Sequence, residues 1–401
     1  MKLLINTEPL NAPLTGIGTY TYRLLEQFVT MPEFTDIKAF TGQHVVPAHE
    51  VLDRLTKPQT SATPEPAPVP AEMVKRSFST KVYGRLKRYA RAIPGAYRLK
   101  QAYGSAVLRQ QQKELATYLY HEPNFIPVRT ENKLITTIHD LSWIHFPEYL
   151  PAKRLEWLQT GIQQAVNSAE HILTVSELVR EEIIDHFKVS PDRVHAVYLA
   201  ADERFQPRQA AQTQSVLDSY GLTHGQYVLY VGTIEPRKRV EELLNAWEMI
   251  DPALRRTQQL VIAGGIGWQY DHVMERLRTL QDQGQLRYLD YVSHADLPFL
   301  VSGSMGFVFP AIYEGFGLPV LEAMASGVPV LCREGTSMAE FAQGAVLLHG
   351  NSTQALAEQL AHLVQDTSLR TDLIERGLKR ASEFSWTKCA RSTVEVYKQC
   401  L

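Results

Sequence analysis

Residues 306–332 read GFVFPAIYEGFGLPVLEAMASGVPVLC, and this stretch indicates the fold of the chain around it. The apolar run 306–310 predicts a buried strand, and a loop with two glycines follows it. Pro319 suits the start of a helix, Gly327 suits its end, and VPVLC predicts the next strand. The pattern therefore predicts a βαβ unit whose glycine-containing loop and helix N-terminus can bind an anion at the carboxyl end of a strand.

Two carboxylates flank this predicted anion site. Glu314 lies in the loop and Glu322 is expected in the first helical turn, so both can face one ligand, with Glu314 at its reacting end. An acidic residue in a first helical turn can also serve only to complement the helix dipole. For Glu322 taken alone, that second explanation is as good as the first.

The composition indicates a soluble globular protein. A chain of 401 residues exceeds one ordinary core, so we expect two domains. The three cysteines show no paired spacing, which predicts neither a disulfide framework nor a thiolate metal site and is typical of a reducing cytoplasm. The opening MKLLIN is too short for a signal peptide, and no run of about 18 apolar residues predicts a membrane span.

Residues 75–113 carry eleven bases and no acid, although the whole chain has a net charge of −2. They follow a proline-rich stretch, 58–70, which we expect to be an exposed loop. Apolar residues at spacings of three and four between Phe78 and Ile93 predict an amphipathic helix with one cationic face. Such a helix can bind an anionic membrane surface. The alternative is a helix packed on its own domain, and no nucleic-acid-binding module is recognisable.

The first half of the chain has two further candidate ligand-binding segments. A predicted strand at 2–6 leads to Gly16-Ile-Gly18, where the backbone can approach a ligand closely, although most such loops only turn the chain. A second predicted strand runs into His139-Asp140, which places His139 at a carboxyl strand end. A histidine there can equally cap a turn.

In the second half, the strand YVLYVG leads to Arg237 and Lys238 at the start of a helix. Basic residues complement the dipole poorly at that position, which indicates an anionic ligand. A diphosphate would accept two parallel hydrogen bonds from the guanidinium and would attract the ammonium as a point charge.

The run from Glu314 to Glu322 and the following Ala-Met-Ala-Ser-Gly-Val-Pro-Val resemble the signature of the retaining glycosyltransferases of family 4. Pro236-Arg237-Lys238 is similar to the diphosphate site of that family, in which Asn or Gly usually stands where this chain has Arg239. The resemblance covers nearly the whole chain outside about 45–112.

The resemblance implies the GT-B fold, an α/β architecture of two Rossmann-like, doubly wound domains that face a central cleft. We expect the acceptor-binding domain at 1–205, a linker at 206–226 and the nucleotide-sugar-binding domain at 227–384. The C-terminal helix, about 385–401, is expected to pack on the first domain.

The resemblance also assigns roles to residues. It implies His139 and Glu314 as catalytic residues and the carboxylate of Glu322 as the ligand of the ribose. The donor diphosphate is assigned to Arg237, Lys238, Gly16 and Gly18. The donor sugar is assigned to Glu314, Gly315, Phe316, Gly317 and Leu318.

The expected reaction is front-face transfer of a sugar with retention of configuration, the leaving phosphate helping to deprotonate the acceptor. No Asp-x-Asp motif lies where this fold would need one, so we expect no cofactor and no metal. His-Asp-Leu with Gly-Ile-Gly-x-Tyr favours GDP-mannose as donor, because this combination is frequent among mannosyltransferases of surface polysaccharides.

The expected acceptor is a saccharide linked to polyprenyl diphosphate, and the expected location is the cytoplasmic face of the inner membrane, bound through about 75–113. The main alternative is a non-catalytic sugar-nucleotide-binding or assembly protein with the same fold. A GT-B epimerase fits less well because it lacks this pair of glutamates, and a phosphorylase-like enzyme needs a cofactor lysine and a far longer chain.

Overall fold

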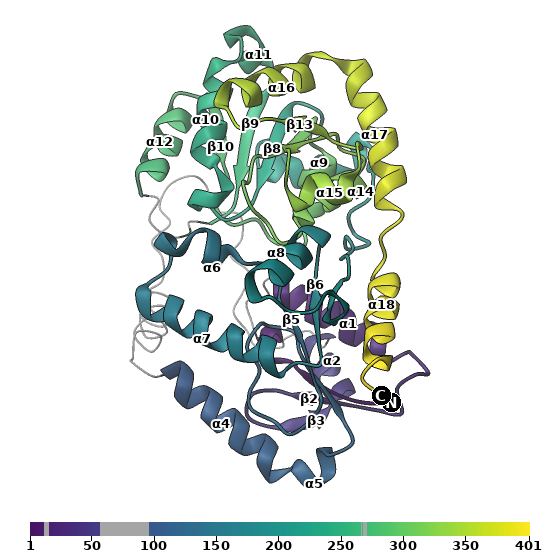
Figure 1. The fold of residues 1–401 in the computed structure, drawn as a ribbon. Helices are drawn as coiled ribbons and strands as arrows, with labels where there is room; N and C mark the ends of the chain where they lie inside the picture. Colours follow the sequence, from purple (N-terminus) through teal and green to yellow (C-terminus); the bar gives the residue numbers. More distant parts are fainter. Residues whose placement is uncertain (12–15, 57–95, 266, 268–270) are drawn as a thin grey trace, which may run out of the picture. The chain divides into compact units, whose positions relative to one another are not determined.

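The computed structural model describes residues 1–11, 16–56, 96–265, 267 and 271–401 (Figure 1). The chain divides into two compact units. Unit 1 comprises Met1–Thr137, Asn167–His171 and Tyr397–Leu401, and unit 2 comprises Ile138–Val166 and Ile172–Val396. Of the basic segment 75–113, the part before residue 96 lies outside the described residues, as does the proline-rich stretch.

The strands of unit 1 are ordered β3-β2-β1-β4-β5, and all neighbours are parallel except β2 and β3. Their bounds are Lys2–Asn6 (β1), Asp36–Phe40 (β2), Val45–Pro47 (β3), Leu119–Glu122 (β4) and Leu134–Thr137 (β5). The chain leaves β1 in one direction and later returns to its other side as β4. The carboxyl ends of β1 and β4 therefore form the topological switch point, where ligands of such sheets bind.

Helices of unit 1 cover this sheet. They are η1 (Glu8–Leu10), α1 (Gly16–Phe28), α2 (Ala48–Thr56), α4 (Ala96–Gln110) and α5 (Gln112–Leu115). The large apolar residues of α1 recur at helical spacing and are buried: Tyr20, Leu24, Leu25 and Phe28. The sequence predicts Gly16 and Gly18 in a loop before the helix, and this detail is wrong, because both lie inside the first turn of α1.

Buried polar side chains join the end of the chain to the core of unit 1. The Tyr397 hydroxyl lies 2.6 Å from Nδ1 of His121, and Nε2 of His121 lies 2.8 Å from the Thr137 hydroxyl. The Tyr20 hydroxyl lies 3.1 Å from the same Thr137 oxygen. Residues from the two ends and the middle of the sequence thus share one hydrogen-bonded network.

The six strands of the large sheet in unit 2 are parallel and ordered β10-β9-β8-β11-β12-β13. Their bounds are Tyr227–Val231 (β8), Gln259–Ala263 (β9), Leu286–Tyr288 (β10), Gly306–Phe309 (β11), Val330–Arg333 (β12) and Leu347–His349 (β13). From β8 the chain adds β9 and β10 on one side of the sheet, and it then adds β11, β12 and β13 on the other side. The switch point of this unit therefore lies between β8 and β11.

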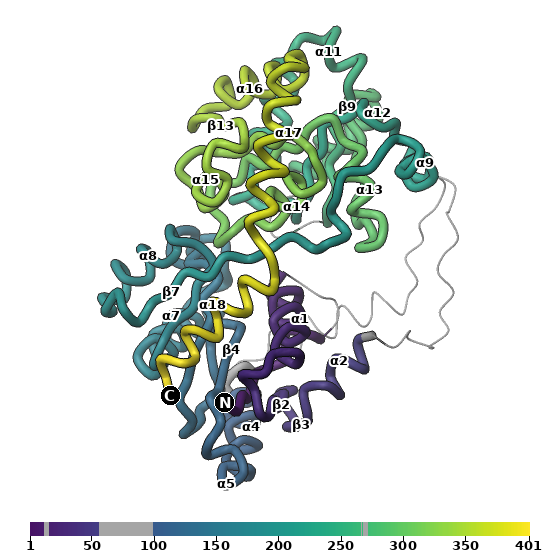
Figure 2. The backbone as a smooth tube through the Cα atoms, turned by 90° about the vertical axis from the view of Figure 1, so that its right-hand side faces the viewer, coloured from purple at the N-terminus to yellow at the C-terminus, as the bar shows by residue number. Residues whose placement is uncertain are grey.

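Helices follow the strands of this sheet in the alternation that a doubly wound sheet requires. Figure 1 shows α10 beside α16, and Figure 2 shows α17 running beside α14. The helices are η4 (Pro236–Lys238), α10 (Val240–Met249), α11 (Pro252–Thr257), α12 (Asp271–Asp282), α13 (Leu297–Ser302), α14 (Leu318–Ala325), α15 (Ser337–Ala342), α16 (Thr353–Gln365), α17 (Thr367–Ala381) and α18 (Trp386–Lys398).

The part of unit 2 that precedes residue 227 contributes two paired strands and several helices. Ser176 caps the N-terminus of α8, because its side chain accepts a hydrogen bond from the N–H of Val179. These elements are α6 (Ser142–His145), η2 (Pro147–Tyr149), α7 (Ala152–Ser168), β6 (His171–Thr174), α8 (Glu177–Phe187), η3 (Pro191–Arg193), β7 (Val194–Ala196) and α9 (Ala210–Ser219). Helix α9 lies in the stretch that we predict as a linker, and that boundary remains a prediction.

The βαβ prediction for 306–332 is confirmed by β11, α14 and β12. One detail is wrong, because Glu322 is the fifth residue of α14 and lies beyond its first turn. Dipole complementation therefore explains Glu322 poorly. None of the helices in the described part of the chain is both long and apolar enough to cross a bilayer.

Candidate active site

The loops after β8 and β11 meet at the switch point of unit 2. The first loop contains η4, and the second runs from Pro310 to Gly317. The backbone N–H of Ile312 donates to the carbonyl of Arg237 at 2.9 Å and joins the two loops. Two residues that are 75 positions apart in the sequence are brought together in this way.

Glu314 lies between two cations. Its Oε1 accepts hydrogen bonds from Nη1 of Arg237 at 2.7 Å and from Nζ of Lys238. Arg237 also pairs with Glu235 at 2.7 Å and donates to the carbonyl of Tyr313 at 3.0 Å. We call Glu314, Arg237, Lys238 and Glu235 the Glu314 cluster. The two positive charges of this cluster are balanced by its two negative charges.

Both cations of the cluster are shielded from water. Only 8% of Lys238 is exposed, and its Nζ lies 4.9 Å from the centroid of the Phe309 ring. Burial lowers the pKa of Lys238, against the attraction of Glu314. Burial also opposes the charge of Arg237, but the carboxylates of Glu314 and Glu235 outweigh it and hold the pKa of Arg237 above its ordinary value. The cluster therefore offers poorly hydrated positive charge to an anionic group.

The two glycines after Glu314 are required by the geometry. A Cβ on Gly315 would lie 1.9 Å from the carbonyl oxygen of His139, so no side chain fits there. Gly317 has a φ of 100°, and a Cβ on it would lie 2.5 Å from Cγ of Met338. The glycine loop thus packs directly on the backbone of residue 139, which brings the His139 segment beside Glu314.

Two serines hold the carbonyl groups of this loop. Ser337 donates to the carbonyls of Glu314 and Phe316 at 2.7 and 3.1 Å, and Ser176 donates to that of Gly315 at 2.7 Å. Within the described part of the chain, the N–H groups of residues 316–318 make no hydrogen bond. These amides precede and begin α14, where the dipole favours an anion or a polar oxygen.

Tyr313 orients the segment that contains His139. Its hydroxyl accepts from the N–H of Leu141 at 2.8 Å and donates to Glu182 at 2.6 Å. Glu182 also pairs with His145 at 2.9 Å, and the rings of His145 and Tyr313 lie 4.7 Å apart. No sequence pattern predicts a role for Tyr313, and its position directly before Glu314 is the only signal.

Glu322 lies apart from the Glu314 cluster, on α14. Its carboxylate makes no hydrogen bond or ion pair with the described residues. Burial raises the pKa of Glu322 to about 8, the nearby carboxylate of Asp202 adds to the rise, and Arg204 opposes it. The side chain is therefore largely protonated at pH 7 and can both donate and accept a hydrogen bond.

Glu340 connects three elements of unit 2. Its carboxylate accepts from the N–H groups of Glu177 and Leu178 at the start of α8, both at 2.8 Å, and from the Tyr198 hydroxyl at 2.8 Å. The structure assigns Glu340 to the helix N-terminus, where a carboxylate is favourable.

The structure brings together His139, Gly315, Arg237, Lys238 and Glu314 within unit 2. Gly16 and Gly18 belong to unit 1 and begin α1 there. A Cβ on Gly16 would meet no atom within 4 Å. Packing therefore does not explain this glycine. In the described ranges, no group of three or more His, Cys, Asp or Glu side chains is arranged to hold a metal ion.

Comparisons with known proteins agree with this geometry. A family model described as Glycosyltransferase Family 4 matches residues 15–205, and one described as Glycosyl transferases group 1 matches residues 218–380. The O-antigen chain mannosyltransferase B of Escherichia coli is 35% identical over 403 residues, which cover 99% of this chain and 100% of that protein. The serotype-specific mannosyltransferase WbdA of Escherichia coli is 28% identical over 58% of this chain and 29% of that protein.

Solved structures support the fold. WaaG, a glycosyltransferase involved in lipopolysaccharide biosynthesis, has a TM-score of 0.69 at 13% identity and covers 99% of both chains. Sucrose-phosphate synthase from Thermosynechococcus elongatus has a TM-score of 0.70 at 18% identity and covers 100% of this chain and 98% of that one. The chain therefore belongs to glycosyltransferase family 4, has the GT-B fold with two Rossmann-like domains, and is a glycosyltransferase.

Proposed function

We propose that this chain is a retaining, metal-independent mannosyltransferase that transfers mannose from GDP-mannose to a saccharide acceptor in the synthesis of a surface polysaccharide. The names of both Escherichia coli relatives support mannose as the sugar, and the name of the first supports O-antigen as the kind of product. The guanine base rests on the resemblance of the motifs at His139 and Gly16 to those of mannosyltransferases.

The observation that carries the proposal is the pairing of Glu314 with Arg237 and Lys238. A donor diphosphate would compete for both cations and has more charge than one carboxylate. Once displaced, the Glu314 carboxylate becomes free to accept hydrogen bonds from hydroxyls of the donor sugar. The same cations then stabilise the charge on the leaving diphosphate, which removes the need for a metal.

The neighbouring residues have matching roles in the proposal. His139 lies beside the reacting carbon, the amides of residues 316–318 bind sugar or phosphate oxygens, and Glu322 binds the ribose. Gly16 and Gly18 bring the backbone at the start of α1 close to the diphosphate. The acceptor-binding domain is 1–205 and the nucleotide-sugar-binding domain is 227–384.

A screen of donors tests the nucleotide and the sugar. Thermal unfolding is measured with UDP-, GDP- and ADP-sugars, and a ligand at 100 times its Kd stabilises by about 2.7 kcal/mol. We expect GDP-mannose to give the largest shift and to be hydrolysed slowly without acceptor. Binding without hydrolysis or transfer would favour the non-catalytic sugar-nucleotide-binding protein. NMR of the product must show the anomeric configuration of the donor, and inversion would exclude the mechanism.

We further propose that the acceptor is lipid-linked and that the enzyme binds anionic membranes through about 75–113. In the described part of this segment, α4 buries Gly104, Ser105 and Leu108 against unit 1. On another face, Leu99 is 70% and Tyr103 is 56% exposed, four residues apart. Lys100, between these two side chains, pairs with Glu8 at 3.0 Å, but the segment 75–113 itself contains eleven bases and no acid. Exposed apolar side chains on so basic a segment suit an interface with anionic lipid.

Co-sedimentation with vesicles tests this attachment. Each base near the surface contributes about 1 kcal/mol, and a screening length of about 8 Å at physiological salt makes the binding salt-sensitive. Arg85, Lys87, Arg88 and Arg91 are changed together to Gln, and separately Leu99 and Tyr103 to Ser. We expect the native protein to pellet with phosphatidylglycerol vesicles at low salt and both variants to pellet less. Native protein that stays in the supernatant would exclude the attachment.

A further inference from the structure

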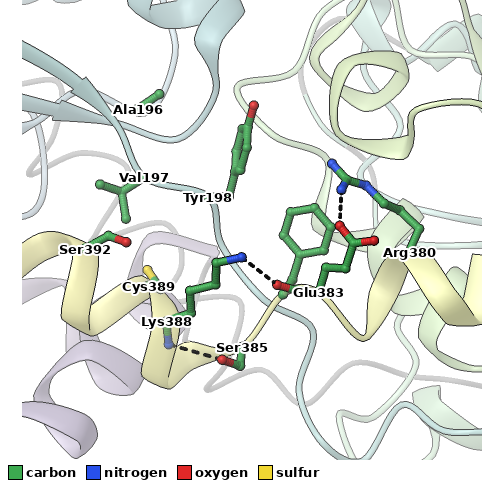
Figure 3. Close-up of a pocket in the computed structure, with 10 residues that line it drawn as sticks. Ala196, Val197, Tyr198, Arg380, Glu383, Ser385, Lys388, Cys389 and Ser392 are labelled. Atoms are coloured by element: carbon green, nitrogen blue, oxygen red, sulfur yellow. Dashed lines mark hydrogen bonds and ion pairs between the residues drawn. The ribbon is translucent and has the colours of Figure 1, made fainter.

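Two cavities in unit 2 lie outside the Glu314 cluster. The first, about 170 Å³, is at the junction of α17 and α18 (Figure 3). Its polar side chains are already engaged, since Tyr198 donates to Glu340, Arg380 pairs with Glu383, and Lys388 donates to the carbonyl of Glu383 at 3.2 Å. A ligand would have to break these contacts, so this cavity carries no proposal.

The second cavity, about 260 Å³, lies between α6, α7 and α8. Aromatic rings form part of its lining, with the ring of His186 lying 6.0 Å from that of Trp143 and 4.7 Å from that of Phe187. Gln159 and Gln163 of α7 add two amides, which lie on one face of the helix because they are four residues apart.

Trp143 contains a buried hydrogen-bond donor, its indole N–H, that has no acceptor among the described residues. The residue is 5% exposed. Buried tryptophan usually finds a partner for this group. Because almost none of the surface of this nitrogen is accessible, Trp143 offers its ring, and not its N–H, to a ligand in the cavity.

The chemistry of the lining selects the kind of ligand. Among the described residues that line the cavity there is no carboxylate, lysine or arginine, so it offers no permanent countercharge to a phosphate or a nucleotide. Aromatic faces with a few amide donors and acceptors suit a neutral molecule that has both C–H faces and hydroxyl groups. A hexose has this character, and one sugar unit suits a cavity of this size.

The cavity is tied to the reaction centre through α6. Trp143 is four residues after His139 and two after Leu141, whose N–H donates to the Tyr313 hydroxyl. His145, at the end of α6, packs against the ring of Tyr313, the residue before Glu314. A saccharide bound here would therefore contact the same helix that is anchored to the Glu314 loop.

We propose that the cavity between α6, α7 and α8 binds a neutral hexose unit of the saccharide acceptor, away from the hydroxyl that reacts. This inference rests on the proposed function, which supplies a saccharide acceptor. The bound unit contacts the rings of Trp143 and Phe187 and the amides of Gln159 and Gln163. The site gives affinity for an acceptor longer than one sugar.

Direct binding is measured by saturation-transfer NMR with the full chain and three neutral probes: mannotriose, maltotriose and chitotriose. The test variant is Gln159→Ala with Gln163→Ala, and the matched control is Thr160→Ala, an exposed residue of α7 outside the lining. We expect at least one probe to bind the native protein and the control, and the double variant to bind about tenfold more weakly. No binding by any probe, or equal binding by the double variant, would overturn the proposal.

A second readout separates this proposal from the proposed function. With a saccharide acceptor, the double variant should raise the acceptor KM about tenfold and leave the donor KM and the acceptor-free hydrolysis of the donor unchanged. A parallel fall in hydrolysis would show that the two residues only support the fold. If GDP-mannose proves not to be the donor, the proposed function fails. The NMR experiment still shows whether the cavity binds a neutral saccharide.

Discussion

The two Rossmann-like sheets each carry a glutamate at the switch point, and the two side chains have opposite surroundings. Glu314 follows β11 beside β8 and is paired with Arg237 and Lys238. Glu122 ends β4 beside β1, and its partners among the described residues are neutral groups: the amide of Asn6 at 2.8 Å, the hydroxyl of Tyr120 at 2.9 Å and the N–H of Asn124 at 3.1 Å. Topology alone therefore does not determine what a switch point can bind.

The charges of the two glutamates differ accordingly. Burial raises the pKa of Glu122 to about 8, because the hydrogen bonds from Asn6 and Tyr120 do not offset the loss of water. Near neutral pH it is therefore largely uncharged. An uncharged glutamate beside β1 and two cations shielded from water beside β8 fit a division in which the second sheet binds the anionic donor.

The largest effect is expected from Glu314→Ala. If this carboxylate contacts the donor sugar near the reacting carbon, kcat should fall by about a thousandfold, which corresponds to about 4 kcal/mol, while donor KM changes little. Steady-state kinetics with varied donor measure both constants. Equal changes in kcat and KM would contradict the assignment.

Lys238→Ala tests whether the shielded cations beside β8 stabilise the donor diphosphate. We expect a loss of about 2–4 kcal/mol of transition-state stabilisation, because the charge on the leaving diphosphate loses one partner. Activity of the native enzyme should survive EDTA. A strict requirement for Mg²⁺ would show that the phosphate charge is balanced in another way.

Glu322 is the intermediate case, with a raised pKa like Glu122 and a position in unit 2. Glu322→Ala should raise donor KM about tenfold with little change in kcat. Glu322→Gln should stay near the native value at pH 7, because the native side chain is largely protonated there. If Glu322→Gln raises donor KM as much as Glu322→Ala does, the ionised carboxylate is required.

Glu122 should affect stability and not catalysis. Its pKa rises from 4.5 to about 8 on folding, so between these values the folded state binds more protons and stability falls as pH rises. Glu122→Gln should therefore weaken the fall in melting temperature between pH 5 and pH 8.5. Glu131→Gln, an exposed acid of the same unit, is the control and should behave like the native protein.

The smallest effect is expected from Arg239, the third base after Pro236. It is exposed and has a φ of 55°, which explains why Asn or Gly suits this position. Arg239→Asn should stabilise by about 1 kcal/mol or less and leave kcat and donor KM unchanged. Thermal unfolding and donor kinetics test this prediction. A loss of donor affinity would show that Arg239 also binds the donor.

Much of the architecture followed from local patterns. The strand, glycine loop and helix around Glu314 were predictable from the sequence. Apolar runs, Pro319 and Gly327 determine the backbone conformation of the few residues next to them. The same holds for the apolar face of α1 and the cap at Ser176. Arg237 and Lys238 were recognisable because two bases at a helix start are unfavourable without a ligand.

Other features were decided only by tertiary structure. Asn6 and Glu122 are 116 residues apart, and Leu141 and Tyr313 are 172 apart, so no local pattern relates them. The raised pKa of Glu322 depends on burial, and its place beyond the first turn of α14 depends on where packing starts that helix. Local sequence determines backbone preferences, whereas the partners of a buried polar group depend on which distant segments the sheet order brings beside it.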